Sequence, residues 1–217
     1  MAISVAVPVG EATAEKLIEK LVPRVESLKI GPYTAGDDVD MGPLVAASAR
    51  DRVLGLVDSG VAQGAELAVD GRGFSMQGYE NGYFVGGCLF DKVTTDMDIY
   101  KQEIFGPVLS VVRAKNYDEA VDLQMTNPYG NGTAIFTRDG DAARDFADRI
   151  NVGMVGVNVP IPVPLAYYTF GGWKASGFGD LNQHGPDGFR FYTRTKTVTS
   201  RWPSGVKEGA DFSIPTM

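Results

Sequence analysis

Residues 106–158 carry the clearest architectural pattern of the chain, and they read GPVLSVVRAKNYDEAVDLQMTNPYGNGTAIFTRDGDAARDFADRINVGMVGVN. Three short apolar runs alternate there with two helical patterns, in the order 108–114, 117–126, 133–137, 142–150 and 153–158. Asp139 precedes the second helical pattern as a candidate N-cap. Short apolar strands that alternate with amphipathic helices predict an α/β fold, built on a mostly parallel open sheet with helices on both faces.

The residues before this stretch fit the same fold class. Helical spacing of apolar side chains predicts helices at 11–29, with a kink at Pro23, and at 46–63. Short β-strands are predicted at 65–69 and 83–93, separated by a glycine-rich loop.

In open α/β sheets, small molecules bind beyond the carboxyl ends of the strands. The last apolar run ends at Asn158, and the loop VPIPVP follows it at 159–164. Proline lacks the backbone donor that a central strand needs, so this loop is stiff and irregular. Asn158 and the loop are therefore candidate walls of a binding pocket.

Composition excludes several classes of function. The 217 residues contain 27 acids and 20 bases, and a net charge of -7 repels phosphate backbones, so no nucleic-acid partner is expected. One cysteine and one histidine cannot form a four-ligand zinc site, a CxxC pair or an intramolecular disulfide. The longest apolar stretch, at 1–9, is shorter than the roughly 18 residues that span a bilayer, so no membrane partner is expected either.

The closing residues follow a different pattern. Aromatic and β-branched side chains alternate with mostly basic ones over residues 189–199, which predicts one long β-strand. An unpaired strand of this length offers its backbone to another sheet. We expect a homo-oligomer, a dimer or tetramer, that forms through this segment.

Two single residues invite a catalytic interpretation. Cys88 lies in GGCLF, where the sequence shows no cation or helix amino end to stabilise a thiolate, and an inert buried thiol is the favoured interpretation. His184 can act as a base, but no Gly-x-Ser-x-Gly elbow accompanies it, and a surface-loop histidine is favoured.

Two further features remain open between a functional and a structural role. Glu103 precedes a rigid Gly-Pro turn and an apolar strand, where its carboxylate can accept hydrogen bonds from ribose hydroxyls or can simply be a solvated charge. The glycine-rich stretch at 171–179 lacks the spacing of a phosphate-binding loop and predicts a tight turn.

A family resemblance bears on these alternatives. The motifs EIFGPV at 103–108, NPYG at 127–130, FTRD at 136–139 and FGGWKASG at 170–177 occur in the order and approximate spacing typical of the NAD(P)-dependent aldehyde dehydrogenase superfamily. Within it the chain resembles the CoA-acylating methylmalonate-semialdehyde dehydrogenase branch, through GYENG at 78–82, NGTAIFT at 131–137 and VGVNVPIPVP at 155–164.

The resemblance implies roles for four residues. Glu103 would bind the nicotinamide ribose of NAD, and Phe105 would pack near the nicotinamide ring. Phe170 would line the substrate tunnel, and Asn158 with its proline-rich loop would shape the wall close to it. In this family the nucleophilic cysteine lies in a Gly-Gln-Arg-Cys-Met-Ala type sequence, so the resemblance implies that the nucleophile lies one residue upstream of Met1 and that the chain contains no catalytic residue of its own.

The implied activity belongs to the whole enzyme. Its substrate would be methylmalonate or malonate semialdehyde, and its products propionyl-CoA or acetyl-CoA, CO2 and NADH. The chain would then be a fragment, inactive alone, with a truncated catalytic domain at 1–186, an oligomerisation strand at 187–202 and a tail at 203–217. Its compartment would be the bacterial cytoplasm or the mitochondrial matrix. The alternatives are an aldehyde dehydrogenase that hydrolyses its thioester, a nucleotide-binding domain without catalysis, and an interaction module that uses the terminal strand.

Overall fold

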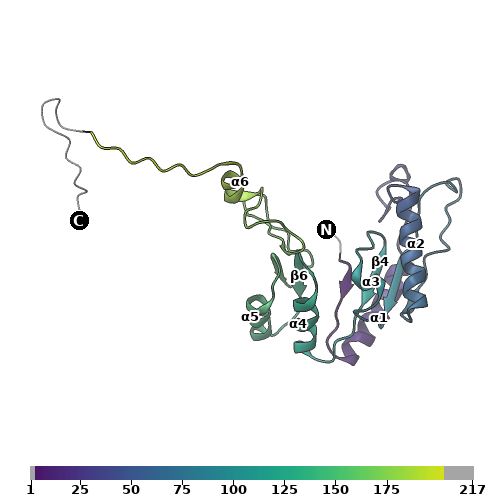
Figure 1. The fold of residues 1–217 in the computed structure, drawn as a ribbon. Coiled ribbons are helices and arrows are strands. Elements are labelled where there is room, and N and C mark those ends of the chain that lie inside the picture. The colour runs from purple at the N-terminus through teal and green to yellow at the C-terminus, as the bar shows by residue number, and fades with distance from the viewer. Residues whose placement is uncertain (1–2, 203–217) are drawn as a thin grey trace, which may run out of the picture. The chain divides into compact units, whose positions relative to one another are not determined.

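The computed structural model describes residues 3–202 (Figure 1). The chain groups into two compact units, one formed by residues up to 163 together with 170–178, and the other by 164–169 together with residues from 179 onward. The predicted domain boundaries at 186 and 202 stay predictions, and the predicted tail at 203–217 lies outside the described residues. No helix among residues 3–202 is both long and apolar enough to cross a membrane.

The larger unit is built on a four-stranded sheet. Its strands are β1 (Val5–Ala6), β2 (Glu66–Val69), β3 (Cys88–Asp91) and β4 (Val108–Val111), in the order β1-β4-β3-β2. β1 and β3 both pair with β4 in parallel, and only β2 runs antiparallel to its neighbour. The prediction of a mostly parallel sheet is therefore confirmed.

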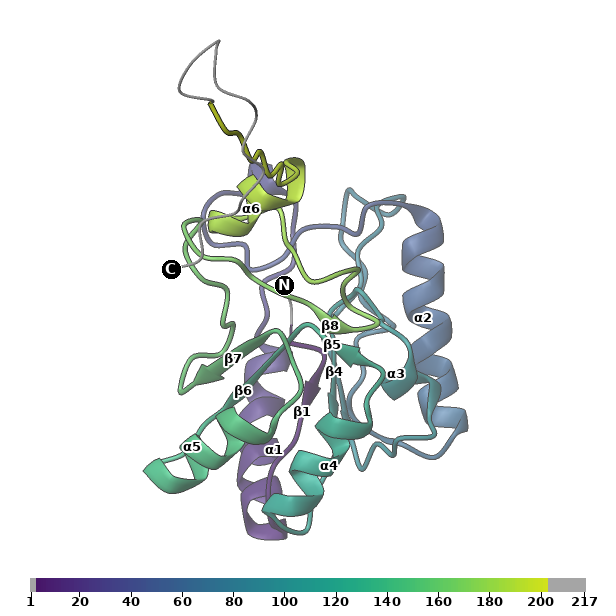
Figure 2. The same ribbon diagram turned by 60° about the vertical axis from the view of Figure 1, so that its left-hand side comes forward.

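Helices cover both faces of this sheet. Leu89 and Val111 are fully buried against α1 (Glu11–Glu26), while Phe90 points to the other face and packs with Val53 of α2 (Ala47–Ala62) and Ile99 of α3 (Asp98–Lys101). Alternation along a strand sends successive side chains to opposite faces, which is why β3 is buried on both sides. In Figure 2 the strands lie between α1 and α2.

The predicted strand-helix alternation after residue 106 is present, but its three strands do not share one sheet. The elements are β4, α4 (Tyr117–Thr126), β6 (Gly132–Ile135), α5 (Gly140–Arg149) and β7 (Met154–Val157). β6 and β7 pair in parallel with each other and form a separate sheet. The expected single sheet is wrong: β1 and β3 occupy both edges of β4, which excludes direct pairing of β6 with β4.

Local signals fixed the two helices of this stretch. The Asp139 carboxylate accepts hydrogen bonds from the backbone N–H groups of Asp141 and Ala142, at 2.8 and 3.3 Å, which confirms the predicted N-cap. The Asn116 side chain caps α4 in the same way, through the backbone N–H of Glu119 at 2.9 Å. Phe146 of α5 and Val121 of α4 are buried in one shared apolar cluster.

The remaining elements are short. They are the 3-10 helix η1 (Tyr33–Ala35) and the two-residue strands β5 (Tyr129–Gly130) and β8 (Trp173–Lys174), which pair antiparallel.

In the smaller unit, the prediction of one long strand at 189–199 is wrong. Residues Gly185–Tyr192 form helix α6, with Pro186 in its first turn, where the missing N–H of proline costs no hydrogen bond. The Thr169 hydroxyl lies 2.7 Å from the His184 carbonyl oxygen and 3.0 Å from an Asp187 carboxylate oxygen, which ties residue 169 to the start of the helix. Residues 193–200 are in no described helix or strand.

A cluster of charged side chains lies at the carboxyl ends of β3 and β4, beside the start of α1. The guanidinium of Arg113 binds both carboxylate oxygens of Asp91, at 3.0 and 2.5 Å, and also binds Glu11 and Glu15 at the start of α1. The Asp91 side chain is only 3% exposed. Burial by itself would raise the pKa of Asp91, but hydrogen bonds from Arg113 and from the Lys92 backbone N–H outweigh it and hold the pKa below its usual value.

Asp91→Asn should lower the free energy of unfolding by about 3 kcal/mol, because it leaves a partly buried guanidinium without its main counter-charge. Since the folded-state pKa of Asp91 lies below the unfolded value of about 3.9, its contribution is complete above about pH 4 and is lost as the pH falls through the folded-state value. Urea unfolding followed by circular dichroism at neutral and acidic pH measures both effects. Asp148→Asn, at an exposed site on α5, is the matched control and should change stability by at most about 0.5 kcal/mol; equal effects of the two variants would contradict the prediction.

Candidate functional site

The segment at 103–105 joins α3 to β4 and presents two groups to solvent. The Glu103 side chain is exposed, and no hydrogen bond or ion pair within residues 3–202 occupies its carboxylate. Phe105 adopts a left-handed backbone conformation with φ of 56°, and it is 77% exposed. A large exposed apolar side chain at a strained backbone position is a typical mark of a functional site.

Two neighbouring residues of α2 hold this segment in place. Arg52 donates through Nη1 to the Glu103 carbonyl oxygen at 3.0 Å and through Nη2 to the Ile104 carbonyl oxygen at 2.6 Å. Gly106 passes so close to Val53 that a Cβ atom there would lie 2.7 Å from Val53 Cγ2. Sequence reasoning missed Arg52, since a charged residue on a helix gives no sign that it binds carbonyl groups 51 residues away.

The beginning of β1 lies at the same end of the sheet as the segment at 103–105. Val5 pairs with Ser110, and the Ser110 N–H donates to the Ser4 carbonyl oxygen at 3.2 Å. Because the two strands are parallel, the residues that lead into β1 and those that lead into β4 meet at the amino ends of the strands. Glu103 and Phe105 therefore lie near the amino ends of the strands. General topology alone would predict a ligand at the opposite, carboxyl ends.

Asn158 has a structural role at the end of β7. Its side-chain Oδ1 accepts from the Thr137 backbone N–H at 2.9 Å, and its Nδ2 donates to the Thr137 carbonyl oxygen at 3.1 Å. Its own backbone has a left-handed φ of 58°. The side chain thus joins the residues that follow β6 and β7, and it fixes the point where the proline-rich loop begins.

Phe170 is half-buried and lies near the other end of β7, where that strand begins. A Cβ atom on Gly153, just before that strand, would lie 2.0 Å from the Gly171 carbonyl oxygen, so the two backbones touch. Phe170 therefore lies near the start of β7, whereas Asn158 follows its end. The structure does not bring these two predicted pocket residues together, and their roles remain predictions.

The glycine-rich segment is a tight turn, as predicted, and its lysine has a defined role. Lys174 Nζ donates to the carbonyl oxygens of Gln124, Met125 and Asn127, at 2.9, 3.0 and 3.0 Å. These are carbonyl groups at the C-terminus of α4, which have no partner inside the helix and carry its negative dipole end. Ser176 Oγ lies 3.1 Å from the backbone nitrogen of Gly130 and accepts its hydrogen. Sequence reasoning also missed this lysine cap.

The structure argues against a nucleophilic Cys88. The side chain is 1% exposed in the core of the main sheet, and burial raises the pKa of its thiol. The prediction of a buried thiol is confirmed, and a raised pKa disfavours the reactive thiolate. His184 is half-buried at the start of α6.

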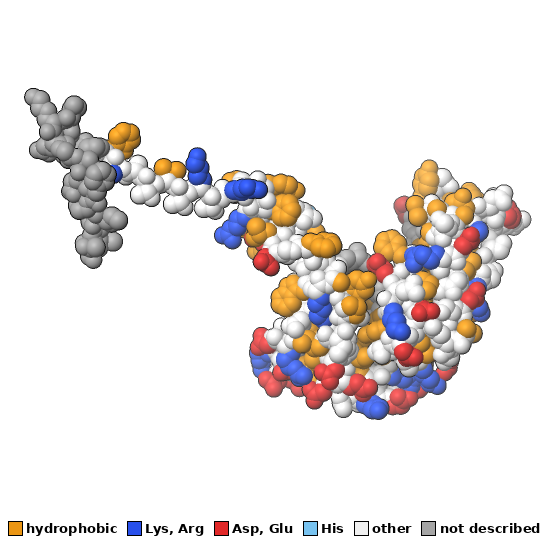
Figure 3. Space-filling view, viewed as in Figure 1, with side chains coloured by type: hydrophobic (Ala, Val, Ile, Leu, Met, Phe, Trp, Pro, Cys, Tyr) orange, Lys and Arg blue, Asp and Glu red, His pale blue; other side chains and the backbone are white. Residues whose placement is uncertain are grey.

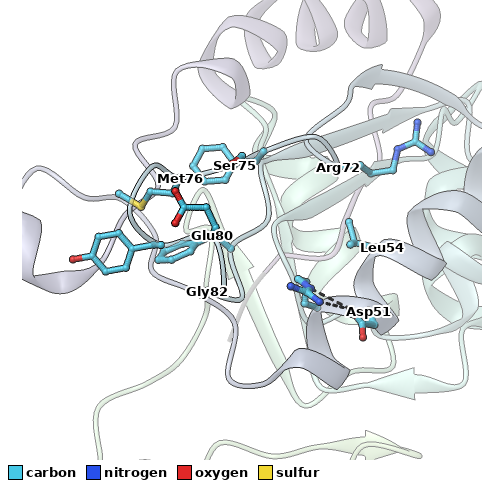
Figure 4. Close-up of a pocket in the computed structure, with 11 residues that line it drawn as sticks. Asp51, Leu54, Arg72, Ser75, Met76, Glu80 and Gly82 are labelled. Carbon is cyan, nitrogen blue, oxygen red and sulfur yellow. Dashed lines mark hydrogen bonds and ion pairs between the residues drawn. The ribbon is translucent and has the colours of Figure 1, made fainter.

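A polar cavity of about 230 Å³ lies between the first half of α2 and the loop at 72–84 (Figure 4). Its charged side chains already have hydrogen-bond or ion-pair partners within the protein. Arg50 binds Asp51 at 3.0 Å, and the Glu80 carboxylate accepts from the Gly78 backbone N–H at 2.8 Å, which lowers the pKa of Glu80. None of the predicted site residues lines this cavity, so it does not form part of the candidate site.

Comparison with known proteins establishes the family. The sequence profile of the aldehyde dehydrogenase family matches residues 2–198. The chain belongs to the aldehyde dehydrogenase family. This membership agrees with the α/β fold and with the order of the motifs at 103–108, 127–130, 136–139 and 170–177.

The relatives of this aldehyde dehydrogenase chain are similar over its full length. It is 61% identical over 218 residues to the malonate-semialdehyde dehydrogenase of Pseudomonas aeruginosa, and 47% identical over 219 residues to the mitochondrial acylating methylmalonate-semialdehyde/malonate-semialdehyde dehydrogenase of Bos taurus. The chain spans 44% and 39% of the length of these two curated relatives.

Solved structures agree with the sequence comparison. A crystal structure of a Sinorhizobium meliloti protein, assigned as a methylmalonate-semialdehyde dehydrogenase and complexed with NAD, superposes with a TM-score of 0.91 at 72% identity. It matches 95% of this chain, which corresponds to 42% of that protein. The methylmalonate-semialdehyde dehydrogenase of Oceanimonas doudoroffii superposes with a TM-score of 0.90 at 53% identity, over 94% of this chain and 42% of that one.

Lys174→Met should lower the free energy of unfolding by about 1–2 kcal/mol, because it keeps the aliphatic stem but removes a charged donor from three carbonyl groups at a helix C-terminus. Urea unfolding followed by circular dichroism measures the change. Lys16→Met on the exposed surface of α1 serves as the control, and it should have little effect. A Lys174→Met protein as stable as this control would show that the cap contributes nothing.

Proposed function

We propose that this chain forms part of the catalytic domain of an NAD-dependent, CoA-acylating (methyl)malonate-semialdehyde dehydrogenase. The products would be propionyl-CoA or acetyl-CoA, CO2 and NADH. The observation that carries the proposal is the identity of 61% to a malonate-semialdehyde dehydrogenase across all of this chain. The acylating activity in the name of the Bos taurus relative supports CoA as the acyl acceptor. In this proposal residues 1–186 belong to the catalytic domain and 187–202 to the oligomerisation segment.

Glu103 and Phe105 have the properties that a nicotinamide cofactor requires. The Glu103 carboxylate is exposed and unoccupied among the described residues, so it can accept hydrogen bonds from the two ribose hydroxyls. The exposed ring of Phe105 offers an apolar surface to the nicotinamide. Bound NAD would supply the hydride acceptor, and these two residues would hold and orient its nicotinamide ring.

The pairing of β1 with β4 supports a position for the nucleophile near these two residues. Val5 lies opposite Ser110 and Ala6 opposite Val111. The described start of β1 therefore lies beside the residues that enter β4. We infer that a cysteine just before Met1, where the family resemblance puts it, would lie near the two proposed cofactor-binding residues. This juxtaposition is what transfer of hydride from a thiol-bound substrate to the nicotinamide requires.

Asn158 and Phe170 complete the proposal on the substrate side. The two hydrogen bonds of Asn158 to Thr137 fix the start of the proline-rich loop, which would shape the wall of the substrate pocket. Phe170 would line the tunnel. The compartment would be the cytoplasm of a bacterium or the mitochondrial matrix, since relatives of both origins are similar to the chain.

The chain alone should form no NADH from malonate semialdehyde, NAD and CoA, because Cys88 is buried and the nucleophile is not part of this sequence. The same chain, preceded by the amino-terminal part of the Pseudomonas aeruginosa relative up to the family's cysteine, should form NADH and acetyl-CoA. NADH absorbance and chromatography of the acyl product measure both. Cys88→Ala in the chimera should leave the rate unchanged.

Each other outcome of this experiment has a defined meaning. NADH formation by the chain alone would refute the missing nucleophile. A free acid in place of the CoA ester, formed at the same rate without CoA, would show a hydrolytic aldehyde dehydrogenase. No turnover by a folded chimera would reject the proposed function.

We further propose that residues 193–200 bind the sheet of a second copy in a homo-oligomer. The segment follows α6, is exposed throughout, and belongs to no described strand of its own chain. Apolar side chains also gather over α6, where Phe189 and Tyr192 are 77% and 76% exposed (Figure 3). An exposed backbone segment beside a helix with exposed aromatic side chains is suited to pairing with another chain.

Thr195→Pro should dissociate the oligomer of the chimera, since proline removes a backbone donor in the middle of the proposed pairing segment. Sedimentation velocity measures the change. Thr195→Val keeps the donor and serves as the matched control. An unchanged sedimentation coefficient for Thr195→Pro would reject this interface.

A further inference from the structure

We propose that Arg52 is a positioning residue for cofactor binding, which acts by holding the backbone that carries Glu103 and Phe105. The inference rests on the proposed function of these two residues. Arg52 would not need to touch the cofactor. Its effect would pass through the carbonyl groups of Glu103 and Ile104.

The segment depends on Arg52 for its hydrogen bonds. Between the last turn of α3 and Gly106, the two bonds from Arg52 are the only ones that the described part of the chain makes to residues 103–105. The backbone becomes bonded to the sheet again only at Pro107, whose carbonyl oxygen accepts from the Cys88 N–H at 2.8 Å. Without Arg52, this stretch would be fixed only by the packing of its side chains.

The two bonds constrain two successive peptide planes. A guanidinium is planar and presents its N–H groups in a rigid fork, so two adjacent carbonyl groups bound to it have a defined mutual orientation. This orientation fixes the peptide that enters Phe105, whose φ of 56° is disfavoured for a residue with a side chain. Between the two exposed side chains of Glu103 and Phe105, the side chain of Ile104 is buried, with 5% of its surface exposed.

The choice of carbonyl partners leaves the carboxylate of Glu103 free. Arg52 forms no ion pair with any residue between 3 and 202, although its nearest neighbours on α2 include Asp51, which pairs with Arg50 instead. An Arg52 side chain bonded to the Glu103 carboxylate would occupy the oxygens that the ribose needs. The observed geometry holds the residue by its backbone and keeps its side chain available.

The test uses the active chimera described above, with NAD, CoA and malonate semialdehyde. Arg52→Gln should raise KM for NAD by about tenfold and leave KM for CoA unchanged, because it removes two charged hydrogen bonds from the cofactor segment only. Arg52→Lys, which can reach one carbonyl group at a time, should give an intermediate value. Arg50→Gln is the matched control, two residues earlier on the same helix, and it should leave KM for NAD within twofold of the parent value.

Two further measurements separate positioning from other roles. Added guanidinium ion should restore part of the NAD affinity of Arg52→Ala, which a loss through misfolding would not allow. In a Glu103→Gln background, Arg52→Gln should raise KM for NAD by less than twofold further, because both changes act on the same contact. Thermal melting of each variant confirms that it is folded.

The outcomes distinguish this inference from the function on which it rests. An active parent whose KM for NAD is the same in Arg52→Gln and Arg50→Gln overturns the positioning role alone. Losses that multiply in the double variant also overturn it, since they show an independent action of Arg52 on the cofactor. A folded parent that forms no NADH, or one whose KM for NAD is unaffected by Glu103→Gln, rejects the proposed site and the inference with it.

Discussion

The position of β4 between two parallel neighbours is the constraint on which the rest of the structure depends. β1 on one side and β3 on the other satisfy both edges of the strand, so β6 and β7 cannot pair with β4, and they pair with each other in a separate sheet. The same pairing places the start of β1 beside the residues that enter β4. It also buries β3 and β4 between α1 and α2. The packing of α2 on the sheet brings Arg52 within hydrogen-bond distance of the segment at 103–105.

Features set by nearby residues were predictable, and features set by distant pairing were not. The sequence alone predicted both ends of α4 and the Asp139 cap, because a cap and its helix are within a few residues of each other. The separation of β6 and β7 from the main sheet was not predictable, since β1 and β4 are about a hundred residues apart and no local pattern records their pairing. The prediction of a terminal strand failed for a different reason, since the signal that decides it is local. Alternating aromatic residues at 189–192 suggested a strand, but Pro186 in the first turn favours a helix.

The candidate site divides in the same way. Motifs identified Glu103, Phe105 and Phe170, because their side chains are the groups that a ligand would contact. Arg52 and Lys174 escaped notice, because both donate to backbone carbonyl groups, which every residue possesses and no motif marks. A residue that positions others through the backbone can therefore be recognised only once the fold has brought donor and acceptor together.

The two arginine clusters show what this difference means for function. Arg113 binds the carboxylates of Asp91, Glu11 and Glu15, and a carboxylate in such a bond has its oxygens occupied and its charge balanced inside the protein. Arg52 instead binds the carbonyl groups of two successive residues, so the backbone is fixed while the neighbouring carboxylate keeps its charge and its acceptors. An ion pair is a good way to stabilise a sheet but a poor way to support a binding carboxylate. On this physical ground Asp91 is a structural acid, and Glu103 is available for a ligand.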